Sequence, residues 1–399
     1  AYYPSVEAGG SDVYLNYADD SADNLTPAEG DYSALTFIHE IGHALGLKHT
    51  FGGTDATGNA GEGPFLPVAE DSTEWSVMSY TTRPSEYHLK YSPMDIAALQ
   101  YLYGPSKLQQ SNDVYLLRED NANFIWDGGG KDTIDGTALT KAITLYMEAG
   151  RWGYAGGKSS FISAPGQITI DIGTEIEDAI GGHGGDTIIG NALSNHISGM
   201  LGNDSMDGAG GNDVIDGGSG TDTVVLHGKR SDFTMTKIAT GYVMTDKVGT
   251  MGVDTLTNVE RIQFDDTMLA LDADGAGGQA YRLYQAAFNR MPDLPGLGFW
   301  ISHMDKGMSL DEVASHFEES QEFIALYGTN PSNTQFVMSM YQNALHRQPE
   351  PAGLIFWVDH LDHGHLSRSE VLKNFSESAE NIAQVVGSIQ NGIEYTFWG

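Results

Sequence analysis

The chain has 399 residues, with 54 acidic and 20 Lys and Arg side chains, which gives a formal net charge of −34. This charge argues against nucleic-acid binding, which needs a basic face, and against attraction to an anionic membrane surface. Cysteine is absent, which excludes disulfides, thiolate metal sites and a cysteine nucleophile. The sequence contains no run of 18 apolar residues, so it predicts no membrane-spanning helix. Fifty glycines among so many acids indicate carboxylates on tight turns, the arrangement by which proteins hold calcium.

The N-terminal part of the chain contains one dense histidine motif. The segment His39-Glu-Ile-Gly-His43-Ala-Leu-Gly46-Leu-Lys-His49 matches H-E-x-x-H-x-x-G-x-x-H. On a helix, His39 and His43 lie one turn apart on one face, so both imidazoles can bind one zinc ion. Glu40 then lies beside the open coordination position as general base, and Gly46 turns the chain so that His49 becomes the third ligand. An amphipathic helix with core histidines is the alternative, but five fixed positions within eleven residues favour zinc.

With this motif the chain resembles the metzincin metalloproteases, and more closely the serralysin family. The segment Ser76-Val-Met78-Ser-Tyr80 resembles the Met-turn of that family. The resemblance implies that Met78 forms an apolar floor beneath the zinc ligands and that Tyr80 is a displaceable fourth ligand, whose hydroxyl can stabilise the oxyanion. Ser92–Gly104 resembles the helix that closes the serralysin catalytic domain, and Asp12–Asn16 alternates like the edge strand along which substrate aligns.

The start of the chain departs from the metzincin pattern. Catalytic domains of that family place several strands and a long helix before the edge strand, whereas only 38 residues precede His39. The resemblance therefore implies that residues 1–105 are the C-terminal part of a metzincin catalytic domain. The other strands would belong to a removed piece or to a second chain.

Five nonapeptides follow one another over residues 181–225: GGHGGDTII, GNALSNHIS, GMLGNDSMD, GAGGNDVID and GGSGTDTVV. They match the RTX pattern G-G-x-G-x-D-x-U-x, which forms a calcium-binding parallel β-roll. A flexible Gly/Asp-rich linker is the alternative, and five units in register favour the roll. Because two nonapeptides make one coil, each ion is expected between turns 18 residues apart. The expected pairs are Asp186 with Asp204, Asp204 with Asp222, and Asn195 with Asp213.

The RTX resemblance also implies calcium ligands from the backbone and from a segment upstream of the roll. Asn195 stands where the other repeats have Asp, and this neutral ligand is expected to hold its ion more weakly. Turn carbonyls complete each site in relatives, and they correspond here to Gly182, Gly184, Gly199, Leu201, Gly202, Gly217 and Ser219. A segment that resembles the start of the serralysin C-terminal domain implies one further calcium, held by Asp127, Gly129, Gly130, Asp132 and Glu177.

The last third of the chain has apolar residues at i, i+3, i+4 and i+7, which predicts helices. Two units repeat at a spacing of 57 residues and resemble a domain of unknown function at the ends of many secreted RTX proteins. The recurring residues are Tyr284, Arg290, Pro292, Gly296, Phe299 and Trp300, and then Tyr341, Arg347, Pro349, Gly353, Phe356 and Trp357.

Together these features predict a multidomain α+β protein. We expect a partial metzincin zinc-protease domain (1–105), a serralysin-like domain with a parallel β-roll and a β-strand cap (106–275), and an all-α repeat domain (276–399). The predicted function is that of a secreted bacterial zinc endopeptidase that cleaves extracellular proteins, with one Zn²⁺ and several Ca²⁺ ions. Family resemblance implies export through a type I secretion apparatus, directed by the C-terminal end. The alternative is a cell-surface or matrix-associated RTX binding protein with an incomplete protease domain. A pore-forming toxin ranks last, since no segment suits membrane insertion.

Overall fold

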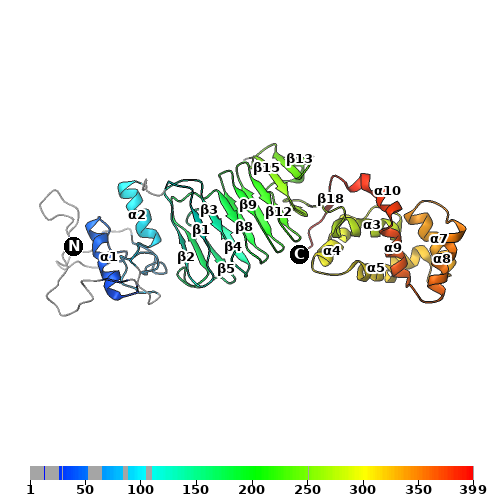
Figure 1. Ribbon diagram of the computed structural model, residues 1–399, viewed down its shortest axis with the longest axis horizontal. Helices are drawn as coiled ribbons and strands as arrows, with labels where there is room; N and C mark the ends of the chain where they lie inside the picture. Colours follow the sequence, from blue (N-terminus) through cyan, green and yellow to red (C-terminus); the bar gives the residue numbers. More distant parts are fainter. Residues whose placement is uncertain are drawn as a thin grey trace. The chain divides into compact units, whose positions relative to one another are not determined.

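The computed structural model describes residues 13, 27–28, 30–52, 65–83, 89–104, 110–249 and 251–398 (Figure 1). The chain divides into two compact units, Ala1–Leu201 and Gly202–Gly399. The predicted edge strand Asp12–Asn16 lies outside the described residues except for Val13. Among the helices of the described ranges, none combines the length and apolar character needed to cross a bilayer.

The first unit begins with two helices, α1 (Tyr32–Ala44) and α2 (Pro93–Tyr103). Helix α2 starts where the sequence predicts a start, because Pro93 occupies the first turn and the Asp95 carboxylate accepts a hydrogen bond from the Ser92 N–H at 3.0 Å. Leu35 of α1 packs with Leu47, Val77 and Met78 in a small buried cluster.

Two parallel-rich layers of short strands follow in the first unit. One has the order β1-β3-β7-β9, and the other has the order β8-β4-β5-β6-β2. Side chains in register between strands form a column, in which Ile134, Ala179 and Ile197 are each 0% exposed. The strands are β1 (Val114–Leu116), β2 (Asn123–Ile125), β3 (Thr133–Asp135), β4 (Ile143–Tyr146), β5 (Trp152–Ala155), β6 (Gln167–Ile170), β7 (Asp178–Ile180), β8 (Thr187–Asn191) and β9 (His196–Ser198).

The second unit continues with the same kind of layers, in the orders β11-β15-β14-β13 and β18-β17-β16-β12-β10. The inward residues of the third, fourth and fifth nonapeptides, Met206, Ile215 and Val224, are all 0% exposed. The strands are β10 (Ser205–Ala209), β11 (Val214–Asp216), β12 (Thr223–Val225), β13 (Phe233–Ile238), β14 (Gly241–Asp246), β15 (Val253–Thr257), β16 (Arg261–Gln263), β17 (Met268–Ala270) and β18 (Ile393–Tyr395).

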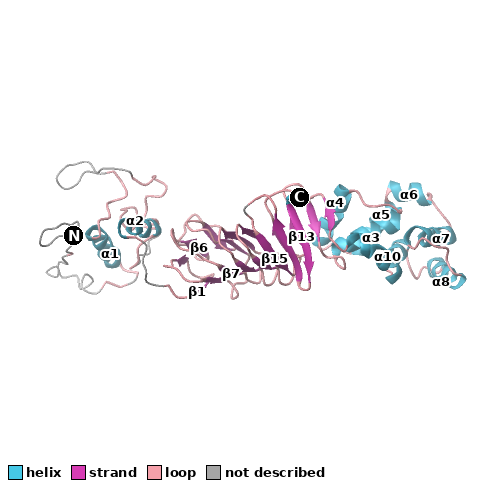
Figure 2. Ribbon diagram, turned by 90° about the horizontal axis from the view of Figure 1, so that it is seen from above, coloured by secondary structure: helices cyan, strands magenta, loops and turns pink. Residues whose placement is uncertain are grey.

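Helices form most of the remaining second unit, shown in cyan in Figure 2. Five of them begin at a serine whose Oγ accepts a hydrogen bond from a backbone N–H of the first turn: Ser309, Ser320, Ser332, Ser367 and Ser378. The helices are α3 (Ala276–Phe288), α4 (Leu294–Asp305), α5 (Leu310–Glu319), α6 (Gln321–Tyr327), α7 (Asn333–Ala344), α8 (Pro351–Asp362), α9 (Arg368–Ser376) and α10 (Ala379–Ile389).

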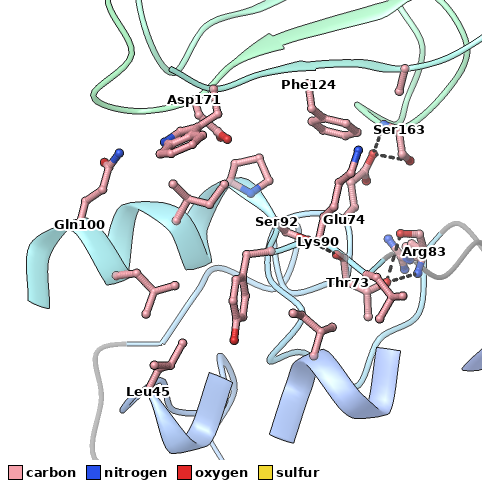
Figure 3. A pocket seen from close by; sticks show the side chains of 18 of the residues that line it. Leu45, Thr73, Glu74, Arg83, Lys90, Ser92, Gln100, Phe124, Ser163 and Asp171 are labelled. Atoms are coloured by element: carbon pink, nitrogen blue, oxygen red, sulfur yellow. Dashed lines mark hydrogen bonds between the residues drawn. The ribbon is translucent and has the colours of Figure 1, made fainter. Parts of the chain in front are cut away.

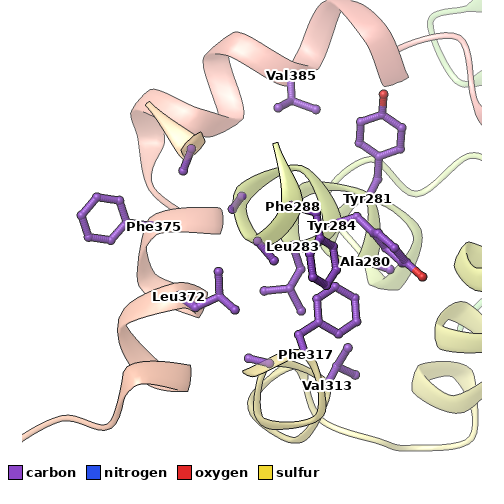
Figure 4. Packing of buried hydrophobic residues seen from close by; sticks show 14 of the residues in the cluster. Ala280, Tyr281, Leu283, Tyr284, Phe288, Val313, Phe317, Leu372, Phe375 and Val385 are labelled. Carbon is purple, nitrogen blue, oxygen red and sulfur yellow. The ribbon is translucent and has the colours of Figure 1, made fainter. Parts of the chain in front are cut away.

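The helices pack on a buried aromatic core around α3 (Figure 4). Phe317 lies between Tyr284 and Phe288, with ring centroids 4.8 and 5.1 Å away. The 57-residue repeat is visible in matching ion pairs, Arg290 with Glu322 and Arg347 with Glu380, each 2.7 Å between N and O.

The prediction of mixed α and β structure with an RTX roll and a helical C-terminal region is confirmed, with one correction. The region 276–399 is not all-α, because β18 pairs antiparallel with β17. The junction before α3 is packed: Arg261 is 2% exposed and forms ion pairs with Asp272 at 2.5 Å and with Asp305 at 2.7 Å. Such long-range pairing leaves no local sequence signal.

Candidate functional site

Three imidazoles from the histidine motif point at one place in the first unit. His39 and His43 lie one turn apart on α1, and Gly46, with φ of 96°, reverses the chain after the helix. His49 thereby returns to the helix, where its Nε2 lies 3.2 Å from Nε2 of His39 and 3.1 Å from Nε2 of His43. Three nitrogens this close form a potential metal site.

The other ring nitrogens of the two helical histidines are held by backbone carbonyls. Nδ1 of His39 donates to the Val77 carbonyl at 2.7 Å, and Nδ1 of His43 donates to the Leu47 carbonyl at 3.0 Å. These bonds fix the tautomer in which Nε2 of each ring carries the lone pair that can bind a metal. Burial lowers the pKa of His43 and of His49, which favours the neutral imidazole that metal binding requires.

The turn that carries Val77 is itself held by a buried carboxylate. Asp95, 2% exposed, accepts hydrogen bonds from the Ser76 hydroxyl at 2.5 Å and the Val77 N–H at 2.7 Å. Burial raises the pKa of Asp95 to about 6. Asp95 therefore positions His39 through Val77. Sequence reasoning did not single out Asp95, although a Ser-Pro-x-Asp pattern at the start of an apolar helix is a recognisable signal.

Met78 lies beneath the histidine helix. It is 1% exposed, and a Cβ added to Gly42 of α1 would lie 2.5 Å from its sulfur. A larger residue at this position would force the Met78 side chain to shift. The position of Met78 agrees with the apolar floor that the serralysin resemblance implies.

Tyr80 and Phe51 border the histidines on the exposed side. The Tyr80 ring centroid lies 4.7 Å from that of His49, and its side chain is 68% exposed. Phe51, which sequence reasoning missed, stacks on His49 with centroids 5.2 Å apart. Glu40 is half-buried and directly follows His39 on α1. Among the described residues, the side of the cluster that Tyr80 borders is therefore exposed.

A cavity of about 970 Å³ lies elsewhere in the first unit (Figure 3). Leu45, at the end of α1, borders it on one side, and Phe124 and Asp171 border it on another. None of the three histidines is among its lining residues in the described part of the chain. Asp171 is 4% exposed, and its Oδ1 has no hydrogen-bond partner among the described residues.

Replacing Asp171 with Asn is expected to stabilise the protein at pH 8 and not at pH 5. Burial and the nearby Asp95 raise the pKa of Asp171 to about 7, so the folded wild type loses stability as the pH rises from about 4 to 7. The expected gain at pH 8 is on the order of 1–3 kcal/mol, measured by urea unfolding at both pH values. An equal effect at pH 5 and pH 8 would contradict the assignment of the cost to ionisation.

Carboxylates gather at the start of the strand region. Side-chain oxygens of Asp113, Asp127 and Asp132 lie within 4.8 Å of one another. Asp132 Oδ1 accepts from the Asp113 N–H at 2.7 Å, and its own N–H donates to Glu177 at 2.8 Å. Gly129 donates its N–H to Asp127 at 2.6 Å, and both Gly129 and Gly130 have positive φ. The structure thus brings the predicted ligands together and adds Asp113, which sequence reasoning missed because no glycine-rich turn precedes it.

Within the roll, the carboxylates of Asp186 and Asp222 accept hydrogen bonds from backbone N–H groups of a neighbouring coil or of their own turn. Asp186 accepts from the N–H groups of Ile143 at 2.8 Å and Gly182 at 2.6 Å. Asp222 accepts from the N–H of Asp204 at 2.8 Å. The N–H groups of these turns thus bond to carboxylates, which fixes the direction of the charged oxygens. The pairings of Asp186 with Asp204 and of Asn195 with Asp213 stay predictions.

Two acids outside the nonapeptides continue these contacts. Asp213 donates its N–H to Asp254 at 3.0 Å, and Asp222 donates its N–H to Glu260 at 2.9 Å. Sequence reasoning missed both Asp254 and Glu260, because a hairpin interrupts the nine-residue period before them.

The predicted carbonyl ligands differ in their surroundings. The Gly182 carbonyl accepts from the Leu201 N–H at 3.3 Å, and the Ser219 carbonyl accepts from the Gly202 N–H at 3.0 Å. Three further predicted ligands lie in close-packed backbone. Gly184 lies close to the Ala142 backbone, the Gly199 carbonyl lies near Asp186, and Gly217 lies near Asp222.

Asn195 uses its amide as a hydrogen-bond donor. Its Nδ2 donates to the Glu177 carbonyl at 3.1 Å, and its Oδ1 accepts from the Asn191 N–H at 3.0 Å. The side chain is 2% exposed. These contacts form a hydrogen-bonded rung at the degenerate repeat, and the weak calcium binding through Asn195 Oδ1 stays a prediction.

An Asn195→Asp variant is expected to be less stable than wild type in chelator, by on the order of 3 kcal/mol. The substitution removes two donors and places a charge against the Glu177 carbonyl in a buried site. Thermal unfolding followed by circular dichroism checks this, with Asn203→Asp as a matched control at an exposed turn. A loss of stability equal to that of the control would argue against the hydrogen-bonded rung.

Comparison with known proteins gives two family matches. The RTX calcium-binding nonapeptide repeat matches residues 119–138, 180–213 and 189–224. A domain of unknown function (DUF4214) matches residues 279–326 and 314–385.

Curated relatives are metalloproteases. The chain is 35% identical over 202 residues to metalloprotease AprA of Pseudomonas entomophila, covering 43% of this chain and 39% of the relative. It is 34% identical over 217 residues to serralysin G of Dickeya chrysanthemi, covering 49% and 44%. The chain therefore spans about two fifths of the length of these relatives. A solved lipase, LipA of Serratia marcescens, shows a local likeness with 18% identity and a TM-score of 0.23, over 26% of this chain and 18% of the lipase.

Proposed function

We propose that this chain, a homologue of serralysin-type metalloproteases over a little less than half of its length and a carrier of RTX calcium-binding repeats, is part of a secreted zinc endopeptidase. Residues up to 105 would be the C-terminal part of a metzincin catalytic domain, and the helical repeats from 276 onward would be an appended module. Extracellular proteins are the proposed substrates, in line with the protease names of its relatives.

The convergence of three imidazoles carries this proposal: Nε2 of His49 lies 3.2 Å from that of His39 and 3.1 Å from that of His43. The backbone bonds at Nδ1 of His39 and His43 orient those two rings, and the lowered pKa values of His43 and His49 favour their neutral forms. With the exposed side at Tyr80, this set fits zinc. A bound zinc ion would supply Lewis acidity at a peptide carbonyl and at the attacking water.

The surrounding residues take separate roles. Glu40 is placed by α1 next to His39 and would accept the proton of the attacking water and pass it to the leaving amine. Tyr80, exposed beside His49, would donate a hydrogen bond to the developing oxyanion. Asp95 would act as a positioning residue, since it holds the turn that orients His39.

A second candidate function is a binding protein that holds zinc without cleaving. Between residues 27 and 104 the described part of the chain contains two helices and no strand. Aligning an extended peptide for cleavage requires a strand edge near the histidines. The predicted edge strand Asp12–Asn16 lies outside the described residues except for Val13, and a second polypeptide is another proposed source of that edge.

Zinc content and casein hydrolysis of the full chain distinguish these functions. The His43→Ala variant is expected to lose zinc, whereas His227→Ala, two residues after the last nonapeptide, is expected to retain it. A wild-type chain that binds no zinc would overturn both functions. Zinc binding without casein hydrolysis would favour the second function, a zinc-holding binding protein. The same test is made in cell extracts that could contain a polypeptide completing the catalytic domain.

A further inference from the structure

A buried carboxylate oxygen at the end of the roll has no partner. Asp222 in the fifth nonapeptide is 0% exposed, and its Oδ1 accepts from the Asp204 N–H at 2.8 Å. Its Oδ2 has no hydrogen-bond partner among the described residues. Leaving such an oxygen unpaired is unfavourable, so the site calls for a proton or a cation.

The first nonapeptide shows how oxygens gather in a turn of this roll. A Cβ placed on Gly181 would lie 2.5 Å from Asp186 Oδ2 and 2.6 Å from the Gly199 carbonyl oxygen. The carboxylate and the carbonyl therefore converge on one point beside a glycine, and the carbonyl comes from the first residue of the repeat two positions later.

The fifth nonapeptide has the same arrangement with a different carbonyl. A Cβ placed on Gly217 would lie 2.7 Å from Asp222 Oδ2 and would overlap the Asn258 carbonyl oxygen. Asn258 has φ of 50°, a left-handed conformation that Asn tolerates and that Gly usually supplies. The Asn258 carbonyl oxygen thus lies beside Gly217 and Asp222 as the Gly199 carbonyl oxygen lies beside Gly181 and Asp186.

The sequence explains why Asn258 arrives there. Gly249–Thr257 reads GTMGVDTLT, which fits G-x-x-G-x-D-x-U-x and forms a sixth copy of the repeat, separated from the fifth by the β13–β14 hairpin. Its strand β15 pairs in parallel with β11, with Leu256 opposite Ile215. Asn258 is the next residue, so it holds the first position of a seventh, shortened copy.

The seventh copy also supplies a second carboxylate. Strand β16 pairs in parallel with β12, with Arg261 opposite Thr223, so Glu260 lies opposite Asp222. Glu260 Oε2 accepts from the Asp222 N–H at 2.9 Å, as Asp222 itself accepts from Asp204. In this seventh copy the acid follows two residues after Asn258, whereas in the fifth nonapeptide Asp222 follows five residues after Gly217. The longer Glu side chain can compensate for the shorter turn.

We propose that Asp222, Glu260 and the Asn258 carbonyl bind one further divalent cation, calcium, beyond the sites between the five nonapeptides. The donors are all oxygen, two of them anionic, which is the set that calcium prefers. The inference rests on the proposed calcium-binding roll and extends it into the cap.

Equilibrium dialysis of the full chain against calcium, with metal content measured, tests this site. Glu260→Gln is expected to bind one calcium fewer than wild type, or to bind one at least tenfold more weakly. The matched control Glu394→Gln, at the exposed position of β18, is expected to behave as wild type. Unchanged calcium number and affinities in Glu260→Gln would overturn the site.

Calcium anomalous scattering from crystals of the wild-type chain gives a readout that does not depend on a variant. A peak next to Asp222 Oδ2 at about 2.3–2.6 Å, the usual Ca–O distance, is expected. Filled sites between the nonapeptides with none beside Glu260 would overturn this inference alone. A wild-type chain that binds no calcium would overturn the calcium-binding roll as a whole.

Discussion

Glu40→Gln is expected to lower casein hydrolysis by roughly a thousandfold while the protein keeps its zinc, a size of loss within the range known for general acid–base groups. The amide has nearly the shape of the carboxylate but cannot accept a proton. Because the three Nε2 atoms that would hold zinc come from His39, His43 and His49, the metal content should not change. Casein hydrolysis is measured on the zinc-loaded chain together with any polypeptide that completes the catalytic domain. The zinc content is measured by elemental analysis.

Glu70→Gln is the control, since this residue lies outside the histidine helix and outside the turn that holds Met78. It should retain wild-type activity. Hydrolysis by Glu40→Gln at the wild-type rate would show that another group accepts the proton. Loss of zinc together with activity would instead show that Glu40 supports the metal site.

Removal of calcium at pH 8 is expected to destabilise the strand region by several kcal/mol, and lowering the pH to 5 should restore part of that stability. Each ion at a hundredfold excess over its dissociation constant contributes about 2.7 kcal/mol. Without calcium, the buried acids favour their protonated forms: burial raises the pKa of Asp222 to about 6 and of Asp254 to about 7. Folded protein then binds more protons than unfolded protein, so the stability of the calcium-free chain falls as the pH rises from about 4 to 7.

Thermal unfolding followed by circular dichroism, with and without chelator at both pH values, measures this effect. With calcium present the dependence should reverse, because protons compete with the ion for the carboxylates. Magnesium is the control, since its shorter bonds and stricter octahedral geometry suit the roll poorly. Helical signal should survive longest, because the aromatic core around α3 contains none of the calcium ligands. Equal midpoints at pH 5 and pH 8 in chelator would contradict the role of the buried acids.

The sequence predicts best what depends on local spacing. Helix periodicity puts His39 and His43 on one face, and a glycine with positive φ returns His49, so their proximity follows from eleven residues. A nine-residue period likewise predicts that inward residues such as Ile215 and Val224 are buried, and both are 0% exposed. Mixed α and β structure with a roll and helices follows from the same patterns.

The features that the sequence did not predict depend on contacts between residues that are far apart in the chain. Glu260 and Asp254 join the acids of the roll only because the β13–β14 hairpin folds out of the coil, and the nine-residue period is lost across it. Asn195 has the position of a ligand, but its amide direction is set by the neighbouring coil at Glu177. Asp95 acts on His39 through two other residues, which no spacing rule contains.

The pairing of β18 with β17 constrains the order in which the second unit can be completed. Residues 393–395 supply one edge of a sheet whose neighbouring strand, Met268–Ala270, lies more than a hundred residues earlier, and the Thr267 hydroxyl bonds to the Tyr395 carbonyl at 3.0 Å. A ribosome makes this strand after every other described strand, whereas export led by the C-terminal end would deliver it to the outside first. In that case β18 would wait, unpaired, for eight helices and then β17 to emerge. In both directions, therefore, the pairing of β18 with β17 must wait until the eight helices that separate them in the chain have been delivered.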